Sequence, residues 1–504
     1  MKNSKIIFVL LYITVLILSM FIEPTGDDWL FLRFFDNHSD WDVEGHTWLY
    51  NQMLLERDYW RPIEDILLKT ETYIPVVYPY LNHFITVTSY FIIAYLLYLL
   101  MGRIKVANKI AFISSIIFLI LATNMGSLLS VDGFTMVWAV LFGMIYVQVY
   151  ISQHRFRKLI LVLAGIFCCL SKETGFVFLI IAPVYKWLIY TLGNDISSIK
   201  ELPWKNIIKD LLLSAIPVLI YLSLWYVQYE ALNETLNETF VAQNAIENNH
   251  LKDIIQGTGG YSLTPVLFMK NVLILYGLAI VPIDTSAIYY GNWILLVVSG
   301  ILSLSGLYLS IIALKKIQSN LLPSFIMICL IFIASLPSLI TRAGEMSSLP
   351  SNIFIVLFFS FIFNKMNIDR KLKNAIFIFV LATLLTDVHK YYLGVIGGRI
   401  GKEMAETIKE LSGETPDNVL WIGTTSGKDK AGVAFNKDPY KAFDCGNAVI
   451  REYNYKYPRK LKKIRLGYKD FEEKKDSIIS MERDKYDCIW ITKDHEIQVL
   501  NNRN

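Results

Sequence analysis

The sequence predicts an all-α, polytopic membrane protein that ends in a small α/β domain. Hydrophobic residues make up 54% of its 504 residues and charged residues only 18%, whereas soluble domains carry about 25% charged residues. Long apolar runs recur up to about residue 390, and a more polar stretch follows. Lys and Arg together number 48 and Asp and Glu 44, and this net charge of +4 is too small to indicate a nucleic-acid partner.

The apolar runs that are long enough to cross a bilayer number about eleven. They lie at 6–22, 80–101, 110–123, 134–151, 159–171, 174–192, 209–227, 292–314, 321–340, 351–364 and 373–390. Lipid offers no partner for backbone polar groups, so each run is expected to be helical.

Basic residues orient these runs through the positive-inside rule. Lys2 and Lys5 precede the first run and no small-x-small cleavage site follows it, so we expect a retained signal-anchor with a cytoplasmic N-terminus. A further apolar stretch at 266–283 is expected to be re-entrant or interfacial on the outer side, because a full span there would move later basic clusters outside. The basic clusters placed in the cytoplasm lie at 103–109, 155–158, 200–209, 315–316 and 365–373.

This topology divides the chain into a transmembrane domain, 1–390, and an extracytoplasmic tail, 391–504. The transmembrane domain carries a large first extracytoplasmic loop at 23–78 and a second outer segment at 228–291. In the tail, apolar runs predict buried strands and amphipathic stretches predict helices. The predicted strands are 418–423 and 488–492, and the predicted helices are 404–411 and 474–483.

Two adjacent carboxylates, Asp27 and Asp28, open the first outer loop a few residues after the first apolar run. A carboxylate pair at a membrane border can act on a lipid-linked substrate, since one carboxylate can serve as a general base. The alternative is that the pair marks a water-exposed helix end. The pair lacks the spacer of an Asp-x-Asp metal motif, so no metal or other cofactor is required, although two carboxylates can bind a divalent cation.

Further polar residues that can carry chemistry fall on the predicted outer side. Arg61 ends the sequence Asp58-Tyr59-Trp60-Arg61, and His83 begins the second apolar run. An arginine can bind a phosphate in bidentate geometry, and a histidine can donate to a phosphate oxygen. The alternative is that Arg61 pairs with a loop carboxylate and His83 caps a helix.

The turn Ser171-Lys172-Glu173 lies between two apolar runs, and Arg342 precedes Leu349-Pro350-Ser351. Lys172 can present a cation to a lipid phosphate while Glu173 orients it, or the two can neutralise each other at a turn. Arg342 supplies a second arginine on the same predicted side.

The order of these motifs resembles the GT-C superfamily of integral-membrane glycosyltransferases. It is most similar to bacterial relatives of the transmembrane and tetratricopeptide-repeat O-mannosyltransferases. The resemblance covers roughly residues 1–365 and departs at Trp60, which is inserted between Tyr59 and Arg61. Tetratricopeptide repeats are also absent from the sequence.

The resemblance implies a GT-C-like fold and transfer of a sugar from a polyprenyl-phosphate donor on the outer face of the cell membrane. The acceptor would be a cell-envelope glycan or a similar molecule. Asp27 or Asp28 would be the general base, and the donor phosphate would be bound by Arg61, His83, Lys172, Glu173 and Arg342. The alternatives are a transporter or flippase for lipid-linked sugars, a polysaccharide polymerase, and a membrane scaffold whose tail binds a partner.

Overall fold

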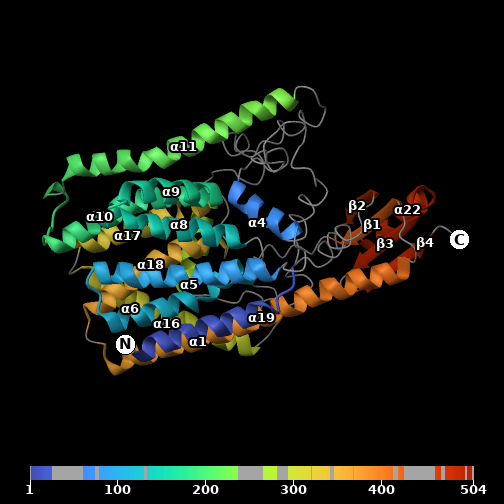
Figure 1. Cartoon of the computed structure of the whole chain (residues 1–504). Coiled ribbons are helices and arrows are strands. Elements are labelled where there is room, and N and C mark those ends of the chain that lie inside the picture. The colour runs from blue at the N-terminus through green and yellow to red at the C-terminus, as the bar shows by residue number, and fades with distance from the viewer. Residues whose placement is uncertain are drawn as a thin grey trace.

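The computed structural model of the chain shows a helical bundle joined by one long helix to a small sheet (Figure 1). The structure describes residues 2–24, 61–73, 79–129, 133–153, 155–201, 203–236, 265–280, 293–318, 321–340, 346–366, 368–412, 418–424, 460–466, 471–493 and 496–501. Asp27, Asp28, Arg342 and most of the two predicted outer segments lie outside these residues.

Each apolar run expected to span the bilayer forms a helix. These helices are α1 (Lys2–Ser19), α5 (Tyr80–Arg103), α6 (Asn108–Leu119), α8 (Phe134–Tyr150), α9 (Arg157–Ser171), α10 (Phe176–Gly193), α11 (Trp204–Leu236), α16 (Trp293–Ile317), α17 (Leu321–Ile340), α18 (Leu349–Asn364) and α19 (Arg370–Ser412).

The helical content and apolar surface are those of a membrane-embedded protein. Within the described part of the chain, six helices are long and apolar enough to cross a membrane. The number rises to seven if α6 and the bent segment after it, which meet at 48°, form one span. Many large apolar side chains on α11, α16 and α17 are exposed, as expected for helices that face lipid.

Short elements connect the main helices. They are η2 (Ala122–Asn124), α7 (Met125–Leu129), η4 (Glu173–Gly175), η5 (Ile199–Glu201), α14 (Pro265–Ile280), η7 (Met346–Ser348) and α4 (Pro62–Tyr73). We call the end of the bundle at which η2, η4 and η7 lie the turn end. Ser348 Oγ donates to the Thr123 carbonyl across 3.4 Å, which joins η7 to η2 at this end.

Helix α14 covers most of the stretch that was expected to be re-entrant or interfacial. It packs antiparallel to the C-terminal half of α17. The Asn271 amide donates to the Leu339 carbonyl at 3.0 Å. Tyr276, about one turn after Asn271, donates from Oη to Oγ of Ser335, about one turn before Leu339, at 3.1 Å. With 16 residues, α14 is about 24 Å long, shorter than the hydrocarbon core of a bilayer.

The tail forms a four-stranded sheet of order β2-β1-β3-β4. Its strands are β1 (Asn418–Thr424), β2 (Lys460–Leu466), β3 (Cys488–Lys493) and β4 (Glu496–Asn501). Strand β1 pairs in parallel with β2 and β3, and β4 pairs antiparallel to β3. The helix between β2 and β3 is α22 (Phe471–Glu482), followed by η9 (Arg483–Lys485).

Both faces of this sheet are covered by helices. Val419 and Trp421 of β1 pack with the last turns of α19, whereas Leu420 and Ile422 pack with Phe471 of α22. Successive side chains of a strand point to opposite faces, so a continuous apolar run fits a strand buried on both sides. Helix α19 is continuous through the predicted domain boundary at 390/391 and therefore belongs to both parts of the chain.

Candidate functional site

The turn between α9 and α10 is built around a close backbone approach. Helix α9 ends at Ser171, whose Oγ donates to the Phe167 carbonyl at 2.7 Å. Lys172 is extended (φ −166°, ψ 148°), and Gly175 N donates to its carbonyl at 2.8 Å. A Cβ added at Gly175 would lie 2.2 Å from the Cys168 carbonyl oxygen, so only glycine fits there. The backbone thus fixes the directions in which Lys172 and Glu173 project.

Arg61 and Glu173 form a two-point ion pair at the turn end. Arg61 Nε and Nη2 donate to the two carboxylate oxygens of Glu173 at 3.2 and 2.8 Å. The Arg61 side chain is 11% exposed and that of Glu173 is 42% exposed. Arg61 directly precedes Pro62, the first residue of α4, where proline is favoured because its missing N–H would have no helical partner. The pair joins the first polar loop to the turn, 112 residues away along the chain.

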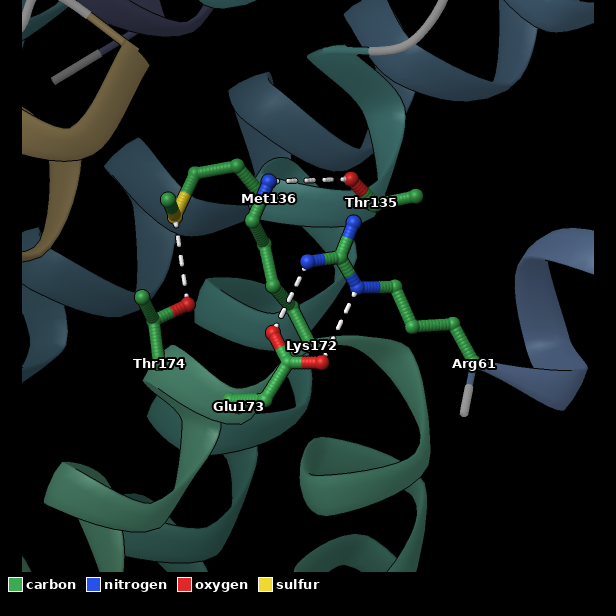
Figure 2. A network of polar contacts seen from close by, with 6 residues as sticks. All are labelled: Arg61, Thr135, Met136, Lys172, Glu173 and Thr174. Atoms are coloured by element: carbon green, nitrogen blue, oxygen red, sulfur yellow. Dashed lines mark hydrogen bonds and ion pairs between the residues drawn. The ribbon is translucent and has the colours of Figure 1, made fainter. Parts of the chain in front are cut away.

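Lys172 extends from the same turn to the first residues of α8. Its Nζ donates to Thr135 Oγ1 at 3.5 Å, and Thr174 Oγ1 donates to Met136 Sδ at 3.4 Å. Figure 2 shows the Lys172 ammonium and the Arg61 guanidinium on the same side of the turn. Two cationic groups from separate segments therefore lie on one side of this turn, one bound to Glu173 and one to Thr135, and such groups can bind an anionic oxygen ligand.

His83, expected to contact phosphate, is buried at the first turn of α5. Its Nε2 donates to the Ile22 carbonyl at 3.0 Å, just after the end of α1. In this structure its ring therefore holds the main chain at the entry to the segment that carries Asp27 and Asp28. That acidic pair and Arg342 lie outside the described residues.

A buried polar network at the turn end was not predicted from the sequence. The Asn352 amide donates to Thr123 Oγ1 at 3.0 Å and to Asn124 Oδ1 at 2.7 Å. The Asn124 amide donates to Tyr90 Oη at 2.9 Å. Nearby, the buried Lys390 ammonium of α19 donates to the Ala122 carbonyl at 2.8 Å. The signal in the sequence is polar residues inside apolar runs, of which Asn352 is the clearest, directly after Leu349-Pro350-Ser351.

Within the described segments, no three or more His, Cys, Asp or Glu side chains are grouped so as to hold a metal ion. Arg61, Lys172 and Glu173 can bind and orient an anion at the end of an apolar bundle.

Searches with this chain matched no protein-family model, no curated protein and no solved structure.

Proposed function

We propose that the protein is a GT-C-like membrane glycosyltransferase. It moves a sugar from a polyprenyl-phosphate donor to a cell-envelope glycan or similar acceptor on the outer face of the membrane. The observation that carries the proposal is that one turn at the end of an apolar helical bundle holds two cations: Glu173 binds the Arg61 guanidinium, and the Lys172 ammonium extends to Thr135. A polyprenyl phosphate can reach a site at the end of a membrane bundle, because its chain lies in the bilayer while its phosphate lies at the bilayer surface.

The proposed reaction is a single displacement. A carboxylate of Asp27 or Asp28 takes the proton from an acceptor hydroxyl, and the hydroxyl oxygen bonds to the anomeric carbon of the sugar. The bond from that carbon to the phosphate oxygen breaks, and its electron pair leaves with the phosphate. The configuration at the anomeric carbon is inverted.

Arg61 and Lys172 stabilise the charge that develops on the leaving phosphate. Preorganised cations in a partly dry site stabilise such charge strongly, because they need no reorganisation during the reaction. Glu173 accepts two hydrogen bonds from Arg61 and so fixes the plane of the guanidinium. In this proposal Arg342 adds a further cation. His83 acts through the main chain of Ile22 rather than on the phosphate.

The test is release of polyprenyl phosphate from a panel of polyprenyl-phosphate sugars, by protein in nanodiscs with a candidate acceptor glycan. Lys172→Ala should lower release by at least tenfold, since one cation at a transition state is worth about 1.4 kcal/mol or more. Lys109→Ala is the matched control, because Lys109 is an exposed lysine in the first turn of α6 at the other end of the bundle. Equal release from both variants would overturn the phosphate site, and transport of the intact donor without release would favour a flippase.

A further inference from the structure

The helix that carries the sheet also contacts the entry to the acidic segment. Helix α19 has 43 residues and contacts the end of α1 before it reaches the sheet (Figure 1). Tyr391 Oη donates to the Leu18 carbonyl at 3.0 Å, near the end of α1. Two to three turns later, Lys402 Nζ lies 3.5 Å from Glu23 Oε1. The acidic pair begins four residues after Glu23 in the sequence.

The approach of α19 to this segment is close at Gly398. A Cβ added at Gly398 would lie 2.7 Å from Glu23 Cβ and 3.0 Å from its carbonyl oxygen, so the helix contacts the main chain directly. Gly401, three residues later on the same helix, has nothing within 4 Å of an added Cβ. Of these two glycines, Gly398 allows α19 to contact the main chain at Glu23, whereas Gly401 has room for a Cβ.

The same segment is also held by α5. His83 Nε2 donates to the Ile22 carbonyl, and Ile22 itself is buried. Ile22 N donates to the Ser19 carbonyl at 3.1 Å, which continues the last turn of α1. Both α5 and α19 thus contact residues 18–24, which we call the entry segment.

The sheet steadies the end of α19 that makes these contacts. Met404, Ala405 and Ile408 lie within the two turns that follow Lys402 and belong to the core of the sheet domain. Trp490 Nε1 of β3 donates to Ser412 Oγ at 3.0 Å at the last residue of the helix. A projecting helix without such packing would fray, because single helices are only marginally stable in water.

We propose that Gly398, Lys402 and His83 are positioning residues that hold the entry segment on α19 and α5, and that this hold supports the reaction of the acidic pair, Asp27 and Asp28, which follows the entry segment in the sequence. This inference rests on the proposed function. It assigns the sheet domain a mechanical part in the reaction: its packing on α19 keeps Gly398 and Lys402 in place.

The experiment compares Gly398→Ala with Gly401→Ala in the full-length protein in nanodiscs. Hydrogen exchange measured by mass spectrometry follows the amides of residues 18–23, and release of polyprenyl phosphate gives kcat and KM for the donor. Gly398→Ala should speed exchange in the entry segment and lower kcat by about tenfold with little change in KM, since small misplacements of reacting groups cost rate. Gly401→Ala should leave exchange and kcat unchanged.

A charge reversal supplies the second variant. Lys402→Glu should speed exchange in the entry segment by about twofold, because pairs this exposed are weak. Adding Glu23→Lys should restore the wild-type rate of exchange.

Two results would overturn the inference: exchange in the entry segment that is unchanged by Gly398→Ala, or faster exchange with an unaltered kcat. If wild-type protein released no phosphate from any donor, the proposed function would fail. The exchange rates would then decide separately whether α19 holds the entry segment.

Discussion

The Arg61–Glu173 ion pair predicts a measurable coupling between two segments that are far apart in the sequence. The perturbations are Arg61→Gln, Glu173→Gln and the double variant, which together form a thermodynamic cycle. The cycle isolates the interaction of the two side chains from what each contributes elsewhere.

The expected magnitude follows from geometry and exposure. Hydrogen bonds to charged groups contribute about 1.5–3 kcal/mol when buried, whereas exposed ion pairs contribute about 0.2–1 kcal/mol. The Arg61 side chain is 11% exposed and that of Glu173 42% exposed, and two bonds join them. The pair lies between the two limits, so we expect a coupling free energy of about 1–2 kcal/mol.

The assay is equilibrium unfolding in mixed detergent–SDS micelles, followed by tryptophan fluorescence. Glu23–Lys402 is the control pair, with charged atoms 3.5 Å apart and exposures of 40% and 49%. Its coupling should stay below about 0.5 kcal/mol. A coupling for Arg61–Glu173 no larger than that of the control would refute the view that this ion pair fixes the loop end to the turn.

Three further substitutions probe the surroundings of the site. Gly175→Ala should shift the turn, because the added Cβ would meet the Cys168 carbonyl. We expect it to lower the free energy of unfolding by more than about 2 kcal/mol and to lower phosphate release; an unfolding curve equal to that of wild type would contradict this. Asn352→Leu should cost about 2–4 kcal/mol, measured by the same unfolding assay, because Asn124 Oδ1 would lose a buried donor; a neutral effect would show that the network is dispensable. Trp490→Phe should weaken the sheet by about 1 kcal/mol through the lost bond to Ser412, and hydrogen exchange in β3 that stays at the wild-type rate would contradict it.

Apolar run length predicted the helices of the bundle well. Lipid and a packed bundle both require the backbone polar groups of such a run to bond to one another, and a helix does this. The tail strands β1 and β3 were also predicted, since they are buried on both faces and read as continuous apolar runs. Strands β2 and β4 were missed. Both lie at the edges of the sheet, where charged residues such as those of the Lys460–Leu466 strand hide the strand pattern.

The extent of α19 was also missed, because polar residues near Lys390 look like the end of a membrane span. The helix continues because the sheet buries Met404, Ala405 and Ile408 on one of its faces. The sequence shows the helical spacing of these apolar residues, but it does not show that they pack on the sheet.

The sequence predicted where some of the candidate site residues lie, but not most of their contacts. Lys172 and Glu173 lie at the turn, as their position between apolar runs predicted. The partner of Arg61 is Glu173 rather than a carboxylate of the loop, and His83 contacts the Ile22 carbonyl. Pairings across more than a hundred residues depend on how helices pack, and a single sequence contains no record of that packing.

The most direct test of the account measures transfer of a labelled sugar from a polyprenyl-phosphate donor to an acceptor glycan by wild type, Asp27→Asn and Asp28→Asn in nanodiscs. Each variant would first be matched to wild type in thermal stability. The account predicts that one of the two variants loses transfer by at least a hundredfold, as expected when a general base is removed, while its affinity for the donor is kept. Wild-type transfer that persists unchanged in both variants would contradict it.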